Sequence, residues 1–402
     1  MRRNELDYLL GTLLDFHKDV SDLLFTVDKP PQVEVSGVLN PVPTNPPIER
    51  LSAFQTETVA LNLIGGSPRL TEDLLRMGSC DSSYSLSDRA RFRVNIFAQR
   101  GNYSIVLRKL TAHIPTVEDL NLPAVISQAS KEKTGLVLVT GATGSGKTTT
   151  LAALIDQINE NSAIHVITLE DPIEFIHPQK KATINQRELG SDFDLFANGL
   201  RAALRQAPKV ILVGEMRDRT TVEIALNAAE TGHLVLSTLH TIDAGQTINR
   251  ILGMFDPEEQ EQVRYRLSDT LRWVISQRLV PKVDGGRFPL VEIMGSNLRT
   301  KESVMLGESE GKTFYEIIEA SYTFGWRTFD SSALEAYKKG IITEETALRY
   351  CTKRGHVGRG IDLIKHSRGE FGGDSSDLRM TQAAVRSSSP APPPPPVTFK
   401  LK

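Results

Sequence analysis

The segment GATGSGKTTT, residues 141–150, combines a glycine-rich loop with a lysine and a run of threonines. It matches the pattern G-x-x-x-x-G-K-[ST] in full, and it lies between the apolar run GLVLVT and the segment LAALIDQINE. Glycine tolerates positive φ, so the backbone N–H groups of such a loop can converge on phosphate oxygens. We therefore predict a buried strand, a phosphate-binding loop and a helix that together bind a nucleoside triphosphate.

Several residues of this loop are expected to contact ATP: Gly141, Thr143, Gly144, Ser145, Gly146, Lys147, Thr148 and Thr149. Lys147 would reach the β and γ phosphates, and the hydroxyl of Thr148 would bind Mg²⁺. A turn with no ligand is the alternative interpretation. The full motif, placed between an apolar run and a helical segment, argues against that alternative.

Two other apolar runs end in acidic residues, in KVILVGEMRD and in VITLEDPIEF. Open sheets bind ligands at the carboxyl ends of their strands, where Glu215 could hold the Mg²⁺ shell or polarise a water molecule. Pro172 keeps Glu170, Asp171 and Glu174 on a loop. Carboxylates near phosphate repel one another unless a metal ion or a proton offsets their charge, so one of them is a candidate general base. A solvated acidic loop is the alternative.

The segment ETGHLVLSTLHT places His233 and His240 at the two ends of a short apolar strand. This spacing differs from that of H-E-x-x-H, and no cysteine cluster completes a zinc site. A structural role is the usual one for such a pair. We favour hydrogen bonds from the histidines to phosphate and to the acidic loop.

Composition indicates an ordinary protein of two or three domains, with 402 residues and a formal net charge of −2. No global basic field favours nucleic acid, and no segment reaches the roughly 18 apolar residues of a membrane span. The two cysteines, Cys80 and Cys351, are far apart and indicate no disulfide framework. A cytoplasmic location is therefore expected.

Strand and helix patterns change along the chain. An α+β pattern with a hairpin at Gly101-Asn102 comes first, a segment with two prolines follows, and apolar runs then alternate with amphipathic helices, which is typical of a mainly parallel α/β sheet. We predict an N-terminal domain at 1–112, a hinge at 113–124, an ATPase domain at 125–298, a helical region at 299–366 and a disordered proline-rich tail at 367–402.

Taken together and in this order, the four motifs resemble those of the secretion ATPase superfamily of type II secretion and type IV pili, with the greatest likeness to the PilT-like retraction ATPases. GATGSGKTTT resembles the Walker A motif, TLEDPIEF the Asp box, LVGEMRD the Walker B motif and AAETGHLVLSTLHT the His box. The resemblance covers residues from about 20 to 295. It implies a homohexameric ring with a PAS-like N-terminal domain and a RecA-like P-loop motor domain in each protomer.

The resemblance also implies site residues. Glu174 corresponds to the catalytic glutamate of the Asp box, Glu215 to the Walker B glutamate, and His233 and His240 to the two box histidines, with His240 assigned to catalysis and His233 to nucleotide binding. Which glutamate is the general base stays open.

The stretch RFRVNIFAQRGNYSIVLRKL resembles the end of the family's N-terminal domain, which supplies arginines to bound phosphate. Arg93, Arg100 and Arg108 are therefore candidate phosphate ligands, from the same or a neighbouring subunit. A planar, permanently charged guanidinium suits charge spread over γ-phosphate oxygens. Solvated arginines on an ordinary hairpin are the alternative.

Departures from the family pattern bear on the direction of work. The tetracysteine zinc motif and longer N-terminal extension of the assembly ATPases are not found here, which favours retraction. The C-terminal signature of retraction ATPases is replaced by SNLRTKESVMLGESEGKTFYEIIE, and Lys209 stands where an aspartate is common. Assembly, type II secretion and an accessory paralogue therefore stay open.

The resulting hypothesis is Mg²⁺-dependent ATP hydrolysis by a hexameric ring that powers pilus retraction and twitching motility. Its expected partners are an inner-membrane pilus platform protein, reached from the cytoplasmic face of the inner membrane, and a paralogous pilus ATPase. A nucleic-acid motor of similar fold is disfavoured because the sequence has no basic stripe and no aromatic stacking platform.

Overall fold

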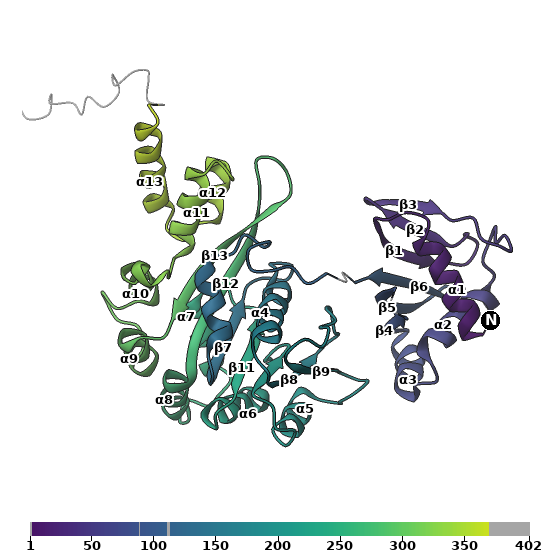
Figure 1. Ribbon diagram of the computed structural model, residues 1–402, viewed down its shortest axis with the longest axis horizontal. Helices are drawn as coiled ribbons and strands as arrows, with labels where there is room; N and C mark the ends of the chain where they lie inside the picture. Colours follow the sequence, from purple (N-terminus) through teal and green to yellow (C-terminus); the bar gives the residue numbers. More distant parts are fainter. Residues whose placement is uncertain (1, 88, 111–112, 370–402) are drawn as a thin grey trace, which may run out of the picture.

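The structure, a computed structural model, describes residues 2–87, 89–110 and 113–369. These residues form two separate sheets and a C-terminal group of helices (Figure 1). Most of the predicted proline-rich tail lies outside the described residues. Its first residue, Ser367, is the last residue of helix α13.

The first sheet is antiparallel, with the strand order β3-β2-β1-β6-β5-β4. Its strands are β1 Val20–Phe25, β2 Gln32–Val35, β3 Val38–Pro41, β4 Ser79–Leu86, β5 Ala90–Gln99 and β6 Asn102–Lys109. Helices α1 Arg3–Leu14, α2 Ala53–Ile64 and α3 Pro68–Met77 share its core. Leu10 of α1, Val59 of α2 and Phe92 of β5 are fully buried there. The small α+β part of the predicted fold class is thus present.

The hairpin between β5 and β6 differs by one residue from the prediction. Gln99 pairs with Asn102, so Arg100 and Gly101 are the two turn residues, not Gly101 and Asn102. Their φ angles are 50° and 77°. A tight turn between twisted strands requires positive φ at both positions, which explains why the glycine takes the second one.

The second sheet has seven strands in the order β13-β12-β7-β11-β10-β8-β9. They are β7 Gly135–Thr140, β8 His165–Glu170, β9 Thr183–Glu188, β10 Val210–Val213, β11 Leu234–Leu239, β12 Leu271–Pro281 and β13 Arg287–Gly295. Neighbouring strands are parallel except for β13, which runs antiparallel to β12. The predicted parallel α/β sheet is confirmed.

Two strands, β9 and β12, form in segments for which the sequence patterns predict no strand, and β13 is the antiparallel member of the mainly parallel sheet. β9 is an edge strand whose exposed positions are polar, which hides the apolar pattern of a buried strand. β12 and β13 form a long hairpin joined by a short loop, and a short loop can connect only antiparallel strands.

Helices surround the second sheet and complete its core. They are α4 Lys147–Asn161, α5 Phe196–Ala203, α6 Arg219–Glu230, α7 Ala244–Leu252 and α8 Gln260–Thr270, preceded by the 3₁₀ helix η1 Ala124–Lys131. β7, β10 and β11 are buried along their whole length because side chains cover both faces of each strand. Val117 and Leu122, from the predicted hinge, also belong to this core.

The strand order places four functional segments side by side. The phosphate-binding loop follows β7, His240 follows β11, and the acidic loop follows β8. Glu215 is the second residue after the end of β10. Since these four strands are adjacent and parallel, their carboxyl ends meet at one edge of the sheet. The fold therefore brings together segments that lie up to 100 residues apart.

The C-terminal helices divide between two cores. They are α9 Leu298–Leu306, α10 Phe314–Ala320, η2 Tyr322–Phe324, α11 Phe329–Lys338, α12 Glu344–Tyr350 and α13 Arg354–Ser367. Val304 and Phe314 join the core of the second sheet, whereas Phe329 and Ile361 pack around the outer ends of β12 and β13. No helix among the described residues is long and apolar enough to cross a membrane.

Leu138 lies at the centre of β7 and is fully buried. We predict that Leu138→Ala lowers the free energy of unfolding by about 2–5 kcal/mol, because it removes buried contacts and leaves a cavity. Calorimetric unfolding measures the change. Leu298→Ala is the matched control, since that side chain is 86% exposed. Equal effects of the two substitutions would contradict the assignment of β7 to the core.

Candidate nucleotide site

The phosphate-binding loop depends on glycine at defined positions. Gly141, Gly144 and Gly146 have φ angles of 143°, 76° and 92°. A Cβ atom at Gly141 would lie 2.5 Å from the carbonyl oxygen of Gln277 and from Oγ of Ser145, so a larger residue cannot fit. Gly146 is the residue before helix α4, whose N-terminus carries partial positive charge. This is the geometry of an anion cradle.

Lys147 lies over this loop. Its Nζ donates to the carbonyl oxygens of Gly141 and Ala142, at 2.9 and 3.0 Å. Burial lowers the pKa of Lys147, while the nearby carboxylates of Glu215 and Glu174 act in the opposite direction. The lysine is therefore close to both acidic segments, in a position to neutralise negative charge above the loop.

A pocket of about 240 Å³ joins the loop to the acidic segments. Its lining includes Gly144 and the polar residues Thr143, Lys147, Thr148, Glu170, Asp171, Glu174, Glu215, Arg217, Thr238 and His240. Oε1 of Glu215 forms an ion pair with Arg217, and its Oε2 lies 3.7 Å from Nε2 of His240. The structure thus brings Glu174, Glu215 and His240 into one cavity with the lysine and the threonine of the loop.

Burial governs protonation around this pocket. It raises the pKa of Glu170 to about 7, although Thr168 Oγ1 donates to the carboxylate at 2.6 Å and Gln186 Nε2 at 3.1 Å. Burial also raises the pKa of Asp171, and the charge of Glu215 adds to that effect. Burial and the Lys147 ammonium lower the pKa of His240. The group therefore carries less negative charge than its four carboxylates suggest.

His233 does not lie in the pocket. It precedes β11, at the opposite edge of the sheet from His240. Its Nδ1 lies 3.0 Å from the carbonyl oxygen of Ala228, in the last turn of α6. A strand of six residues separates the two histidines, which is too far for both to reach one phosphate. Within one chain His233 therefore lies away from the pocket, and its contact with nucleotide stays a prediction.

The predicted arginines also lie outside the pocket in a single chain. Arg100 is at the exposed tip of the β5–β6 hairpin. Nε of Arg108 pairs with Oδ1 of Asp22 at 2.9 Å, within the N-terminal domain. Arg93 comes nearer, since its charge acts on Asp171 and opposes the rise in that residue's pKa. Among the three, only Arg93 therefore acts on the acidic loop of its own chain.

Sequence reasoning missed other contributors to the site. Arg217 pairs with Glu215, and Oγ1 of Thr238 donates to the carbonyl oxygen of Gly214 at 2.6 Å, which holds the turn before Glu215. Gln186 and Glu188 bind the acidic loop from β9. The short spacing within GEMRD points to Arg217, whereas the β9 residues have no local signal because their partners are distant in sequence.

A cavity larger than this pocket lies elsewhere. It has a volume of about 600 Å³ and is found near the amino ends of the parallel strands, beside Lys131, Lys133, Lys209 and Gly232. It contains neither the glycine-rich loop nor an acidic residue of the Asp or Walker B motifs. Ligands of open α/β sheets bind at the carboxyl ends, so the smaller pocket is the candidate nucleotide site. Nothing in the structure explains why residue 209 is lysine.

The donor set fits a magnesium ion that arrives with nucleotide better than a resident metal. Among the residues described, no group of three or more His, Cys, Asp or Glu side chains could hold a metal ion. Mg²⁺ usually binds through one or two protein oxygens together with phosphate oxygens and water. Thr148 and Glu215, which line the same pocket, could supply such oxygens.

Residues 83–320 match the type II/IV secretion system protein family. The chain belongs to this family. It is similar to the type IV pilus retraction ATPase PilT of Pseudomonas aeruginosa, with 40% identity over 327 residues that cover 81% of this chain and 93% of the relative. The type IV pilus ATPase PilU of the same organism is 38% identical over 347 residues, covering 86% and 88%. The predicted secretion-type ATPase is thereby confirmed.

A solved structure agrees with these relatives. The crystal structure of the pilus retraction motor PilT with bound ADP aligns with a TM-score of 0.77 and 40% identity, covering 88% of this chain and 98% of that one. The likeness therefore extends over both sheets of the secretion ATPase. That structure contains bound ADP.

Protonation of Glu170 leads to a pH-dependent prediction. In the folded protein the pKa of Glu170 is about 7, above the ordinary value of 4.5. The free energy of unfolding should therefore fall as pH rises from about 5 to above 7, because the unfolded chain loses this proton more readily. Glu170→Gln removes the titration. We expect the two proteins to have similar free energies of unfolding near pH 5. Above pH 8 the free energy of unfolding of the variant should be higher by up to about 3 kcal/mol, which thermal unfolding at the two pH values measures. A difference independent of pH would contradict this assignment.

Proposed function

We propose that this secretion ATPase hydrolyses Mg²⁺-ATP in the pocket between the glycine-rich loop and the acidic segments, and that it powers type IV pilus retraction as a homohexameric ring. The observation that carries the proposal is the convergence of Lys147, Glu174, Glu215 and His240 in one pocket. Similarity to PilT over 93% of that relative's length supports the choice of retraction.

In the proposed reaction the residues of the pocket bind the phosphates, orient the attacking water and neutralise negative charge. The backbone N–H groups of the loop and the ammonium of Lys147 would bind the phosphates. Glu174 or Glu215 would orient the attacking water and accept its proton, at the edge where the γ phosphate lies. With its lowered pKa, His240 is neutral near pH 7 and could hydrogen-bond to the γ phosphate.

Magnesium, when bound with ATP, would offset the charge that develops on the phosphate oxygens. Thr148 and Glu215 are the residues that would hold it. Arg217 would have to release Glu215 in part for this role, because the two side chains form an ion pair. The pair therefore provides a means of keeping the Walker B glutamate neutralised until nucleotide binds.

The arginines of β5 and β6 enter the proposal through the ring. Arg100 and Arg108 do not reach the pocket of their own chain, so contact with phosphate would require the pocket of a neighbouring subunit. Their permanent charge suits transition-state stabilisation across such an interface. The ring, the cytoplasmic location at the inner membrane and contact with a pilus platform protein belong to the same proposal.

An accessory role beside another pilus ATPase is the second candidate function. The chain is nearly as similar to the type IV pilus ATPase PilU, at 38% identity and over 88% of that relative, as it is to PilT, so similarity to PilT does not by itself decide between the two roles. The intact acidic residues of the pocket favour a chain that hydrolyses ATP itself. Turnover by the isolated protein and the phenotype of the deletion strain separate the two.

Glu215→Gln tests the assignment of the Walker B residue. We expect it to reduce ATP turnover by at least about 100-fold, because removal of one preorganised catalytic group commonly costs this much. Affinity for a fluorescent ATP analogue should stay within about threefold of the wild type, since uncharged Gln keeps the shape of the side chain. The matched control is Glu223→Gln, an exposed position on helix α6. Turnover near the wild-type rate would overturn the assignment.

Deletion of the gene and a Lys147→Ala strain test the biological role. If the protein is a retraction motor, both strains should carry many surface pili and show no twitching motility, because pili form but cannot be withdrawn. Electron microscopy and a motility assay measure both outcomes. Few pili would indicate an assembly motor. Unchanged pili and motility would rule out a required role in this pilus system.

A further inference from the structure

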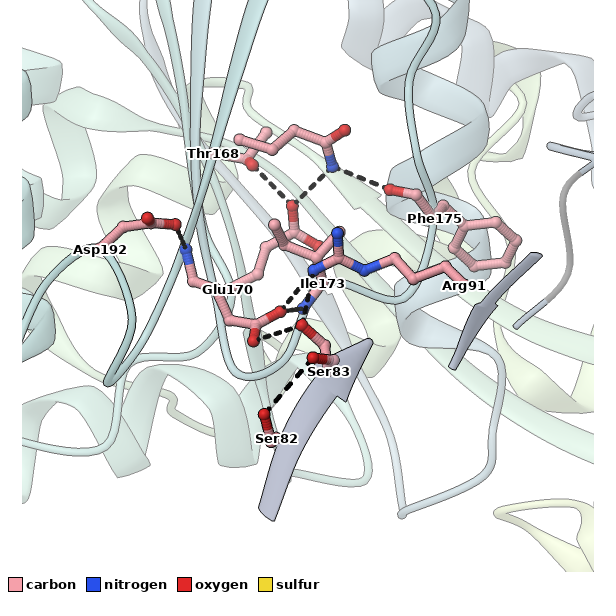
Figure 2. A network of polar contacts seen from close by, with 10 residues as sticks. Ser82, Ser83, Arg91, Thr168, Glu170, Ile173, Phe175 and Asp192 are labelled. Carbon is pink, nitrogen blue, oxygen red and sulfur yellow. Dashed lines mark hydrogen bonds and ion pairs between the residues drawn. The ribbon is translucent and has the colours of Figure 1, made fainter. Parts of the chain in front are cut away.

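Two alternate residues of β9, Gln186 and Glu188, hold the acidic loop in place. Figure 2 shows this network, with Ile173, Phe175 and Arg91 labelled. Glu188 Oε2 accepts from the backbone N–H of Ile173 at 3.2 Å. Gln186 donates to the carbonyl oxygen of Phe175 at 2.8 Å and accepts from the N–H of His177 at 2.9 Å. Side chains two apart on a strand point to the same face. The loop that carries Glu174 is therefore attached to β9 on both sides of that residue.

Glu188 also binds the N-terminal domain. Nη2 of Arg91 lies 2.8 Å from Glu188 Oε2, the same oxygen that accepts from Ile173. Oγ of Ser83 donates to Glu188 Oε1 at 2.8 Å and accepts from Nη2 of Arg91 at 3.0 Å. The Glu188 side chain is 6% exposed and that of Arg91 20%. One buried carboxylate thus connects β4 and β5 with the acidic loop.

A second contact between the domains provides a comparison. Nε of Arg69, on helix α3, donates to the carbonyl oxygen of Gly190 at 3.0 Å. Gly190 is the second residue after the end of β9, and its φ angle is 81°. None of the hydrogen bonds to the acidic loop described above involves Arg69 or Gly190. This contact joins the same two domains without reaching Ile173.

We propose that Arg91 and Ser83 are positioning residues for the acidic loop, acting through Glu188, so that the placement of the N-terminal domain sets the rate of ATP hydrolysis. The inference rests on the proposed function of Glu174. The inference concerns residues outside the nucleotide site, since neither Arg91 nor Ser83 lines the nucleotide pocket.

The physical basis is the cost of a buried carboxylate without its partner. Arg91 and Ser83 hold the two oxygens of Glu188, which leaves Oε2 directed at the N–H of Ile173. If the N-terminal domain moves away, Glu188 must turn toward water to recover its solvation. Ile173 then loses its acceptor, and Glu174 is the next residue. A shift of about 1 Å in a catalytic group can lower a rate by about 100-fold.

The test compares Arg91→Ala, Arg91→Lys and Arg69→Ala in the full-length protein. Steady-state hydrolysis gives kcat and KM, and a fluorescent ATP analogue gives affinity. Hydrogen exchange of the segment 171–177, measured without nucleotide, reports on the Ile173 amide independently of turnover. Arg91→Lys retains a positive charge and one donor for Glu188. Arg69→Ala weakens the contact between the domains and leaves Glu188 intact.

We expect Arg91→Ala to lower kcat by about 10-fold, because the buried carboxylate of Glu188 loses a charged hydrogen-bond donor. The affinity for the ATP analogue should change by less than about threefold. Exchange in segment 171–177 should become faster. Arg91→Lys should recover part of both effects, and Arg69→Ala should change neither by more than about twofold.

Three outcomes would overturn the inference: wild-type kcat and exchange in Arg91→Ala, equal losses in Arg69→Ala, or a loss confined to nucleotide affinity. If the wild-type protein itself does not hydrolyse ATP, the proposed function fails. In that case hydrogen exchange still decides whether Arg91 holds the loop, so the two failures can be told apart.

Discussion

Mutual repulsion among carboxylates at the phosphate edge of the sheet is the constraint on which the rest of the structure depends. Glu170, Asp171, Glu174 and Glu215 all line a pocket suited to a polyanion. Burial raises the pKa of Glu170 to about 7, and Arg217 forms an ion pair with Glu215. Protonation of Glu170 and the ion pair of Glu215 thus reduce the repulsion at this pocket, which favours binding of phosphate together with a divalent cation.

The edge strand β9 relates this site to the rest of the chain. Its polar side chains connect the acidic loop with the N-terminal domain: Gln186 and Glu188 bind the loop, and Glu188 also binds Ser83. An edge strand can serve in this way because it has a neighbour on one side only. Movement of the N-terminal domain, as proposed for a ring motor, would therefore act on the loop that carries Glu174 without passing through the core.

Local patterns were sufficient for much of the fold and half of the site. The apolar runs before Gly141, Asp171 and Glu215 predicted buried parallel strands, and these strands place Lys147 beside the acids. Local patterns failed where the pattern was polar or the partner was distant. β9 has no apolar alternation that distinguishes it from a loop, and β13 could be recognised as antiparallel only once its pairing with β12 was known.

The sequence by itself determined the chemistry of this protein: the glycines of an anion cradle, the lysine that approaches phosphate, and the carboxylates placed after apolar strands. These are properties of residue type and short spacing, and short spacing controls local backbone geometry. Only the tertiary structure decided which residues meet. It separated His233 from His240 by the length of a strand, paired Arg108 with Asp22, and joined Arg91 to Glu188 across 97 positions of sequence. Such contacts depend on strand order and domain placement, for which neighbouring residues carry no signal.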